Sequence, residues 1–392
     1  MTGSGPARPG SGPATRPAPW DYAAPWNARG YITDLGGPVH WIEFSPGPDK
    51  QTPGPDNQTP GPDNQASSPD SQTSGPDSQA PKAQDSATEP AIVFVHGLGG
   101  SHLNWCLLGP HLAAGRRVVA LDLRGFGLTP GLRVNSTVQA NARLLDRFVN
   151  EVIGTPVILV GNSMGGMISV LETAAHPDAV SGLVLIDPAL PLPPRKPDWQ
   201  VFAQFLLYAM PGLGGLVVAK ALSSISPEAA VQRLVQLCFA DASRADPEMV
   251  KAEVALSTRR LPAKPAQASA RARVFLVAAR SLLRVLGRRQ RYHAMMAGIE
   301  VPVLLIGGDA DRLVPVAAVR QAAARNPRWE SVILSGVGHT PQLEVPEAVV
   351  GLIRDWLART RGTTGQGTTG QRTTEQGNTG QGSTGHAATD RA

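Results

Sequence analysis

The sequence is poor in cysteine and in uninterrupted apolar runs, and each shortage excludes a class of protein. Two cysteines in 392 residues, Cys106 and Cys238, cannot build a disulfide framework, and neither stands in a metal-ligand spacing. The N-terminus lacks the apolar stretch of a secretory signal peptide. The longest apolar window, residues 201–222, is interrupted by Pro211 and adjoining glycines, so it predicts two short helices rather than a membrane span. We therefore expect a cytoplasmic protein with at most peripheral membrane contact.

Clustered positive charge is also scarce. The formal net charge is only +5, and the one basic run is "RRQRY" at residues 288–292. A nucleic-acid-binding protein would gather basic and aromatic residues along one face, so no nucleic-acid partner is expected. The run continues a stripe that starts at Arg273 and predicts a solvated helix face, with contact to anionic lipid or to a substrate carboxylate as the alternative. The oligomeric state is left open.

Proline and glycine are abundant, with 36 and 42 residues, but they concentrate in three segments. One of them contains "QTPGPDN" twice in succession, and the C-terminal segment repeats threonine, glycine and glutamine with a period near five. Such segments have almost no apolar residues to bury and cannot offset the entropy lost on ordering. We predict disorder for residues 1–19, 46–89 and 361–392, which leaves roughly 300 residues for a well-buried core.

Short aliphatic runs alternate with helical patterns through most of the remaining chain. Runs of this kind, apolar on both faces, are typical of strands in a parallel sheet. A further segment, "YITDLGGPVHWIEF", alternates around a Gly-Gly turn and predicts an N-terminal hairpin. The pattern predicts a doubly wound, mostly parallel α/β sheet. The aliphatic runs are residues 91–95, 117–123, 156–160, 181–187, 301–307 and 330–336.

One long interval, residues 188–298, breaks this alternation. It has helical patterns interrupted by proline and glycine and no strong strand pattern. We predict a helical cap, inserted after the sixth strand and lying over the carboxyl edge of the sheet, where ligands of such folds bind. The core would then consist of residues 20–45, 90–187 and 299–360.

The stretch "PVILVGNSMGGMISV" places Ser163 between glycines, directly after a predicted strand and before a predicted helix. This is the context of the G-x-S-x-G elbow, in which a serine is exposed on a strained turn. Side chains at Gly161 or Gly165 would collide with the neighbouring strand or helix, and Gly166 would let the helix pack closely. Ser163 is therefore our candidate nucleophile.

A serine hydroxyl needs a base, and the base needs an orienting acid. Asp311 in "GGDADRLVP" and His339 in "GVGHTPQLE" each follow a predicted strand, in the order Ser–Asp–His. The carboxyl ends of parallel strands meet at one edge, so the three side chains are expected to converge. The loop "HGLGGS" also follows a strand, and the backbone N–H groups of Leu98 and Met164 are the candidate oxyanion donors.

With these motifs the chain resembles the α/β-hydrolase family over about residues 31–356, the insertion excluded. The motifs are "HGLGGS", "LDLRGFGLTP", "GNSMGG", "GDADRLVP" and "GHTPQLE". The resemblance implies a Ser163–His339–Asp311 triad, an oxyanion hole from Leu98 and Met164, a cap over the active site and no cofactor. The elbow is also similar to that of carbon–carbon bond hydrolases that act on ring-cleavage (meta-cleavage) products. Those enzymes usually place tryptophan after the catalytic histidine, where this chain has Thr340.

Several other polar residues compete for these roles. Asp309 and Asp187 are rivals of Asp311 for the acid. His96 is expected to brace the oxyanion loop and Asp122 to fix a loop. The remaining histidines show no partner pattern and are assigned to surface or core positions; they are His40, His102, His111, His176 and His293.

The predicted function is hydrolysis of an ester, or a similar carbonyl compound, with an apolar acyl part through an acyl-enzyme. Aliphatic segments of the cap favour an apolar pocket and a small apolar ester or ketone substrate. Three alternatives remain: a carbon–carbon bond hydrolase, perhydrolysis or acyl transfer on the same triad, and a non-catalytic binding protein on a hydrolase fold.

Overall fold

The computed structural model describes residues 13–47, 89–131, 136–191 and 213–364. Nearly all of the predicted disordered insertion and tail, and the first half of the apolar window at residues 201–222, lie outside the described residues. Within the described ranges, no helix is both long enough and apolar enough to cross a membrane. The second half of the window forms the helix α5 (Leu213–Ser224), which begins within the glycine-rich break.

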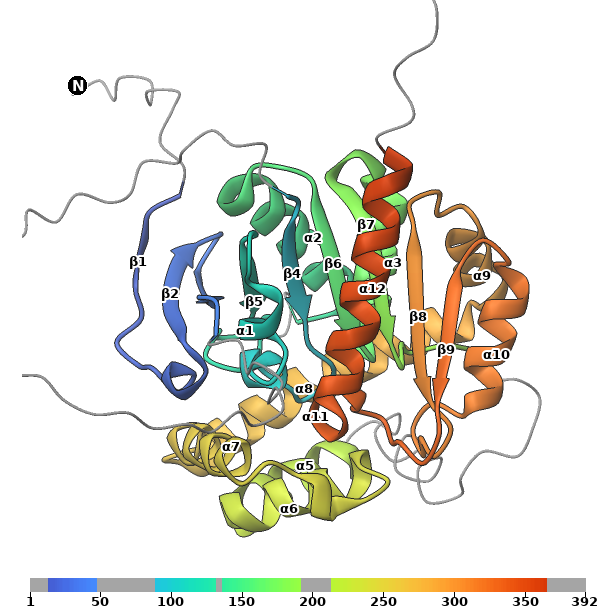
Figure 1. Cartoon of the computed structure of the whole chain (residues 1–392). Coiled ribbons are helices and arrows are strands. Elements are labelled where there is room, and N and C mark those ends of the chain that lie inside the picture. The colour runs from blue at the N-terminus through green and yellow to red at the C-terminus, as the bar shows by residue number, and fades with distance from the viewer. Residues whose placement is uncertain (1–12, 48–88, 132–135, 192–212, 365–392) are drawn as a thin grey trace, which may run out of the picture.

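A single nine-stranded sheet forms the centre of the described chain, in the order β1-β2-β3-β5-β4-β6-β7-β8-β9 (Figure 1). The strands from β5 to β9 in this order run parallel, and β1, β2 and β3 pair antiparallel. This confirms the predicted mostly parallel α/β sheet. The strands are β1 (Thr15–Pro17), β2 (Ala28–Asp34), β3 (Pro38–Phe44), β4 (Ala91–Val95), β5 (Val118–Leu121), β6 (Val157–Asn162), β7 (Val180–Ile186), β8 (Val303–Gly308) and β9 (Glu330–Leu334).

The N-terminal hairpin is present, but the sheet extends one strand beyond it. β2 and β3 pair around a turn in which Gly36 and Gly37 have φ of 74° and 116°, values that favour glycine. β1 then pairs with β2, so the prediction of disorder for residues 1–19 is wrong at residues 15–17. All three residues of β1 are exposed and lack an apolar pattern, which hid the strand from the sequence. Pro17 suits an edge position because it donates no ladder hydrogen bond.

Helices cover both faces of the sheet, and each face has its own hydrophobic core. Strand residues alternate between the two cores: Val93 and Val95 belong to one, and Ile92 and Phe94 to the other. α2 and α3 lie behind the sheet in Figure 1, whereas α12 crosses its front. These helices are α1 (Gly109–Leu112), α2 (Val138–Phe148), α3 (Met164–Ala175), α10 (Val316–Arg325), α11 (Pro341–Glu344) and α12 (Pro346–Thr364).

Between β7 and β8 the described residues are helical and include no strand. The helices follow β7, which is the strand predicted at residues 181–187; because β1 adds a strand, it is the seventh in the chain and not the sixth. Figure 1 shows α5, α6 and α7 beyond the carboxyl ends of the parallel strands, as expected for a cap. α9 instead packs against α3 and buries Tyr292 and Met296 in the core behind the sheet. The inserted helices are α5, α6 (Pro227–Cys238), α7 (Pro247–Arg259), α8 (Pro265–Gly287) and α9 (Arg289–Ala297).

Candidate active site

Ser163 stands on a sharp turn between β6 and α3. Its backbone has φ 55° and ψ −119°, a sparsely populated conformation for a residue with a side chain, which costs on the order of 1–3 kcal/mol. The surroundings hold it there: the Ser163 N–H donates to the Ile186 carbonyl at 3.2 Å, and its carbonyl accepts from Ala189 at 2.9 Å. The turn is therefore the strained elbow that the sequence predicts.

The glycines around Ser163 are required by close packing. A Cβ at Gly165 would lie 2.0 Å from the Val95 carbonyl oxygen, and one at Gly161 would lie 2.7 Å from the backbone of Gly165. A Cβ at Gly166 would lie 2.8 Å from Pro188 Cβ. All three distances are shorter than atomic contact permits, so the elbow accepts no larger residue without displacement.

His339 and Asp311 come together from loops that follow β9 and β8. Nδ1 of His339 lies 2.7 Å from Oδ2 of Asp311, and both side chains are buried. The other carboxylate oxygen, Oδ1, accepts from the backbone N–H groups of Leu313 and Val314 at 2.7 and 3.0 Å. These bonds fix the orientation of the carboxylate, and Asp311 in turn orients the imidazole.

The two rival carboxylates have other partners. Asp309 accepts from the Gly336 N–H and the Ser335 hydroxyl at the surface. Asp187 is fully buried with φ 39° and accepts from the Gly308 N–H at 3.1 Å. Burial and the neighbouring Asp311 charge raise the pKa of Asp187 well above its ordinary value. Of the three acids, Asp311 is the one bonded to His339.

The candidate oxyanion loop follows β4 and is braced by His96. Nδ1 of His96 donates to the Gly97 carbonyl at 2.8 Å, while Nε2 accepts from the Leu123 N–H at 3.1 Å. One donor and one acceptor match the neutral ring, and burial lowers the pKa of His96 to about 4. The bracing role predicted for His96 is confirmed. Leu98 lies on this loop, and Met164 opens α3, where N–H groups have no partner within the helix.

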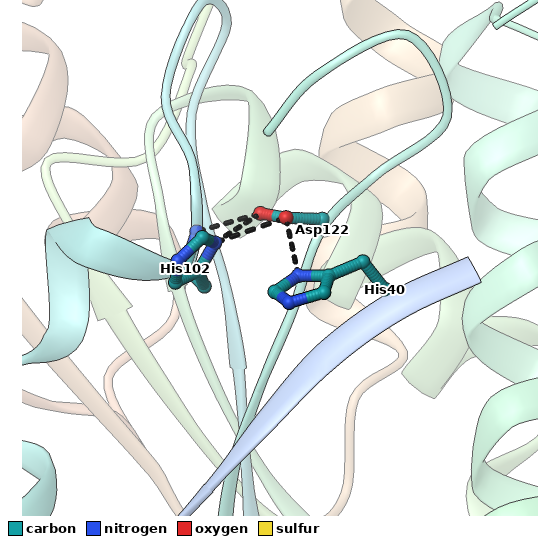
Figure 2. Close-up of side chains that lie close together, drawn as sticks. All are labelled: His40, His102 and Asp122. Atoms are coloured by element: carbon teal, nitrogen blue, oxygen red, sulfur yellow. Dashed lines mark hydrogen bonds and ion pairs between the residues drawn. The ribbon is translucent and has the colours of Figure 1, made fainter. Parts of the chain in front are cut away.

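A second buried cluster supports the same loop, and the sequence did not reveal it. Figure 2 shows His40 from β3 and His102 from the short helix η2 (His102–Trp105) pointing at Asp122. The two Nδ1 atoms lie 2.8 and 2.9 Å from Asp122 Oδ2. The carboxylate also accepts from the backbone N–H groups of His102 and Leu128, at 2.7 and 2.8 Å.

Two imidazoles and a carboxylate are a donor set that a transition metal can use. Here, however, each carboxylate oxygen already accepts a backbone N–H, and both rings bond to the carboxylate. The network is closed by its own hydrogen bonds, and it joins β3, η2 and the loop after β5. We therefore interpret it as a structural brace, which confirms the loop-fixing role predicted for Asp122.

Two further residues, which the sequence analysis did not identify, connect the loop that carries His339 to its surroundings. Asn162 donates its side-chain amide to the backbone oxygens of Ile186 and His339, at 3.0 and 3.1 Å. Glu344 is buried and accepts from the N–H groups of Gly338 and Asp241, at 2.7 and 3.0 Å. Both residues lie inside quoted motifs, but only the fold shows what they contact.

Ser163 and His339 line one cavity of about 530 Å³, which lies within the roughly 300–1,000 Å³ of small-molecule sites. Gly97–Gly100 form the wall next to Ser163. The inserted helices supply a large part of the remaining lining, mostly with apolar side chains. These include Leu234, Val235 and Leu237 from α6 and Phe275, Leu282, Leu283 and Leu286 from α8.

Comparison with known proteins agrees with this architecture. The family model described as "alpha/beta hydrolase fold" matches residues 90–346. The chain therefore belongs to the α/β-hydrolase family, and the predicted family and fold are confirmed.

Among curated relatives, the chain is 31% identical over 218 residues to a monoacylglycerol lipase of Mycolicibacterium smegmatis, covering 53% of this chain and 65% of that protein. It is 28% identical over 258 residues to the "Dihydrolipoyllysine-residue acetyltransferase component of acetoin cleaving system" of Pseudomonas putida, covering 66% of this chain and 60% of that protein. The chain thus spans slightly less than two thirds of these two relatives.

Among solved structures, a putative lipase (lip1) of Acinetobacter baumannii AYE superposes with a TM-score of 0.61. The match has 19% sequence identity and covers 88% of this chain and 95% of the other. At this identity the likeness supports the fold and not the substrate.

Proposed function

We propose that this protein is a serine hydrolase that cleaves an ester with an apolar acyl chain through an acyl-enzyme. The observation that carries the proposal is the placement of Ser163 and His339 on one apolar cavity, with Asp311 bonded to His339 at 2.7 Å. The likeness to a monoacylglycerol lipase supports an ester as the substrate.

In the proposed mechanism, His339 accepts the proton of Ser163 as the serine oxygen attacks the ester carbonyl. Asp311 holds the imidazole by its Nδ1 and stabilises the cation that forms. The N–H groups of Leu98 and Met164 donate to the developing oxyanion, each contributing roughly 3 kcal/mol in the transition state. His339 then protonates the departing alcohol, and water activated by His339 hydrolyses the acyl-enzyme.

The cavity supports an apolar acyl part. Leu282, Leu283 and Leu286 come from one helix, α8, and face the space next to the elbow. Burying an acyl chain there contributes about 0.8 kcal/mol for each methylene. We therefore expect kcat/KM to rise with acyl chain length until the cavity is filled.

The test is to measure aryl-ester hydrolysis and acyl-enzyme formation by intact mass for wild type and Ser163→Ala. We expect turnover and a single acyl adduct in wild type, and neither in Ser163→Ala. Ser181→Ala is the matched control, because Ser181 lies at the opposite end of the sheet, near the start of β7. Equal adduct formation in Ser163→Ala would overturn the role of Ser163. Turnover of a dienoate ketone without any ester turnover would instead favour the carbon–carbon bond hydrolase.

A further inference from the structure

Two carboxylates, Asp246 and Glu253, belong to the otherwise mostly apolar lining of the cavity. Asp246 caps α7 by accepting from the Met249 N–H at 2.7 Å. Glu253 lies on α7, lines the same cavity as Gly97–Gly100 and Asn104, and contacts Ser101, the residue after that glycine loop. No step of the proposed ester hydrolysis uses it. Burying a carboxylate in an apolar cavity wall costs free energy unless the group has hydrogen-bond partners. A ligand that supplies such a partner would therefore bind more favourably.

The described residues offer the Glu253 carboxyl only a weak hydrogen bond. Its hydrogen bond to a described residue comes from the Ser101 hydroxyl, at 3.4 Å from Oε1, which is longer than the roughly 2.5–3.0 Å usual for an O–H···O bond. Glu253 therefore retains capacity to accept hydrogen bonds from a molecule in the cavity.

The position of Glu253 limits which part of an ester it can contact. It lies beside the loop that carries Leu98, the candidate oxyanion donor, so the ester carbonyl would be bound close by. The acyl chain is accommodated by the leucines of α6 and α8, which offer no polar partner. We therefore expect a group that bonds to Glu253 to belong to the alcohol part of the ester and not to its acyl chain.

Charge favours a neutral hydroxyl over a cation. Burial raises the pKa of the Glu253 carboxyl, and the nearby Arg260 guanidinium only partly opposes that change. Arg312 lines the same cavity and would repel an ammonium group. A hydroxyl bonds to the carboxyl in either protonation state.

We propose that Glu253 binds a hydroxyl of the alcohol moiety, making this protein selective for long-chain monoesters of a polyol such as glycerol over simple alkyl esters. The proposal rests on the proposed function. Glu253 acts here as a specificity residue and takes no part in proton transfer.

The kinetic test compares glyceryl monodecanoate, methyl decanoate and decanoylcholine as substrates of the full chain. We expect wild type to prefer the glyceryl ester. Glu253→Leu should lower kcat/KM for the glyceryl ester about tenfold and leave the methyl ester within twofold. Glu253→Gln should retain part of the preference. Glu248→Gln, on the exposed part of the same helix, is the control and should match wild type.

A binding test separates this proposal from the catalytic one. Calorimetry on Ser163→Ala with decyl glyceryl ether, which cannot be hydrolysed, should show about tenfold weaker binding after adding Glu253→Leu. Decyl methyl ether should bind both variants equally. The role of Glu253 would be overturned if Glu253→Leu weakened binding of both ethers equally or left the ratio of kcat/KM for the glyceryl and methyl esters unchanged. A wild-type preference for decanoylcholine would overturn it as well. If the wild type hydrolysed no ester but the ethers still bound with the expected selectivity, only the proposed hydrolase activity would be overturned.

Discussion

At the scale of single residues, three aspartates were candidates for the acid that orients His339. Asp311 bonds to His339, Asp309 bonds to a surface turn, and Asp187 bonds to Gly308, the last residue of β8. Asp309 and Asp311 are two residues apart and look equivalent in the sequence. In the fold their side chains have different partners, because the loop turns between them.

Replacing Asp311 by asparagine should lower kcat about 10⁴-fold, because the amide no longer stabilises the imidazolium or holds the correct tautomer. The measurement is steady-state hydrolysis of an aryl ester, with circular dichroism to confirm folding. Asp309→Asn is the control and should stay within threefold of wild type. Similar losses in both variants would contradict the assignment of the acid.

His96 makes the free energy of unfolding depend on pH. Its pKa is lowered from 6.5 to about 4 in the folded protein, so below pH 6.5 the unfolded chain binds more protons than the folded one. Stability should therefore fall as pH drops from about 6.5 to 4, by up to about 3 kcal/mol from this residue. Urea unfolding at a series of pH values measures the slope. His96→Gln should be less stable at pH 7 but show a shallower slope, and an unchanged slope would contradict the prediction.

At the scale of elements, the elbow depends on the close approach of α3 to β4. Gly165→Ala would place a Cβ 2.0 Å from the Val95 carbonyl oxygen, which cannot move without breaking the sheet. We expect a loss of at least about 2 kcal/mol in the free energy of unfolding and a displaced Ser163. Urea unfolding and active-site labelling measure the two effects.

The control for this substitution is Gly351→Ala in α12, where an added Cβ has open space. A helix-interior glycine costs about 0.5–1 kcal/mol relative to alanine, so this variant should gain stability. Tolerance of alanine at both positions would show that the elbow packs less tightly than the structure indicates.

The sequence predicted the elements and the candidate triad because both follow simple rules. Strand patterns are local, and parallel strands bring their carboxyl ends to one edge, so Ser163, Asp311 and His339 could be placed together. The partners of Asp122 could not be found in this way. His40 and His102 lie 82 and 20 residues from it, in segments without a shared motif. Glu253 was missed for a related reason, since nothing in the sequence fixes how α7 lies over the sheet.

At the scale of the whole molecule, a long insertion separates two parts of one sheet. Phe44 of β3 and Ile92 of β4 both pair with Val118 of β5, so they lie two strand spacings apart, about 10 Å. A short connection can span this distance. Residues 48–88, which include most of the predicted disordered insertion, are therefore expected to be dispensable for the fold.

Replacing residues 48–88 by a glycine-serine linker of about ten residues should change the free energy of unfolding by about 1 kcal/mol or less, because loop-closure entropy varies slowly with length. Urea unfolding and aryl-ester turnover measure the effect. Removal of residues 365–392 is the parallel control. A loss of several kcal/mol on replacing the insertion, with the tail deletion neutral, would show that the insertion packs on the core.

The bond from the His339 N–H to the Cys238 carbonyl, at 2.6 Å, has a consequence for substrate entry. Cys238 ends α6, and Glu344 ties the next residues, Ala240 and Asp241, to the same loop. The end of α6 is thus attached to the backbone of His339, the proposed general base. If α6 moves to admit a large substrate, we expect the movement to be smallest at this hydrogen bond, so that the His339 side chain would keep its position relative to Asp311.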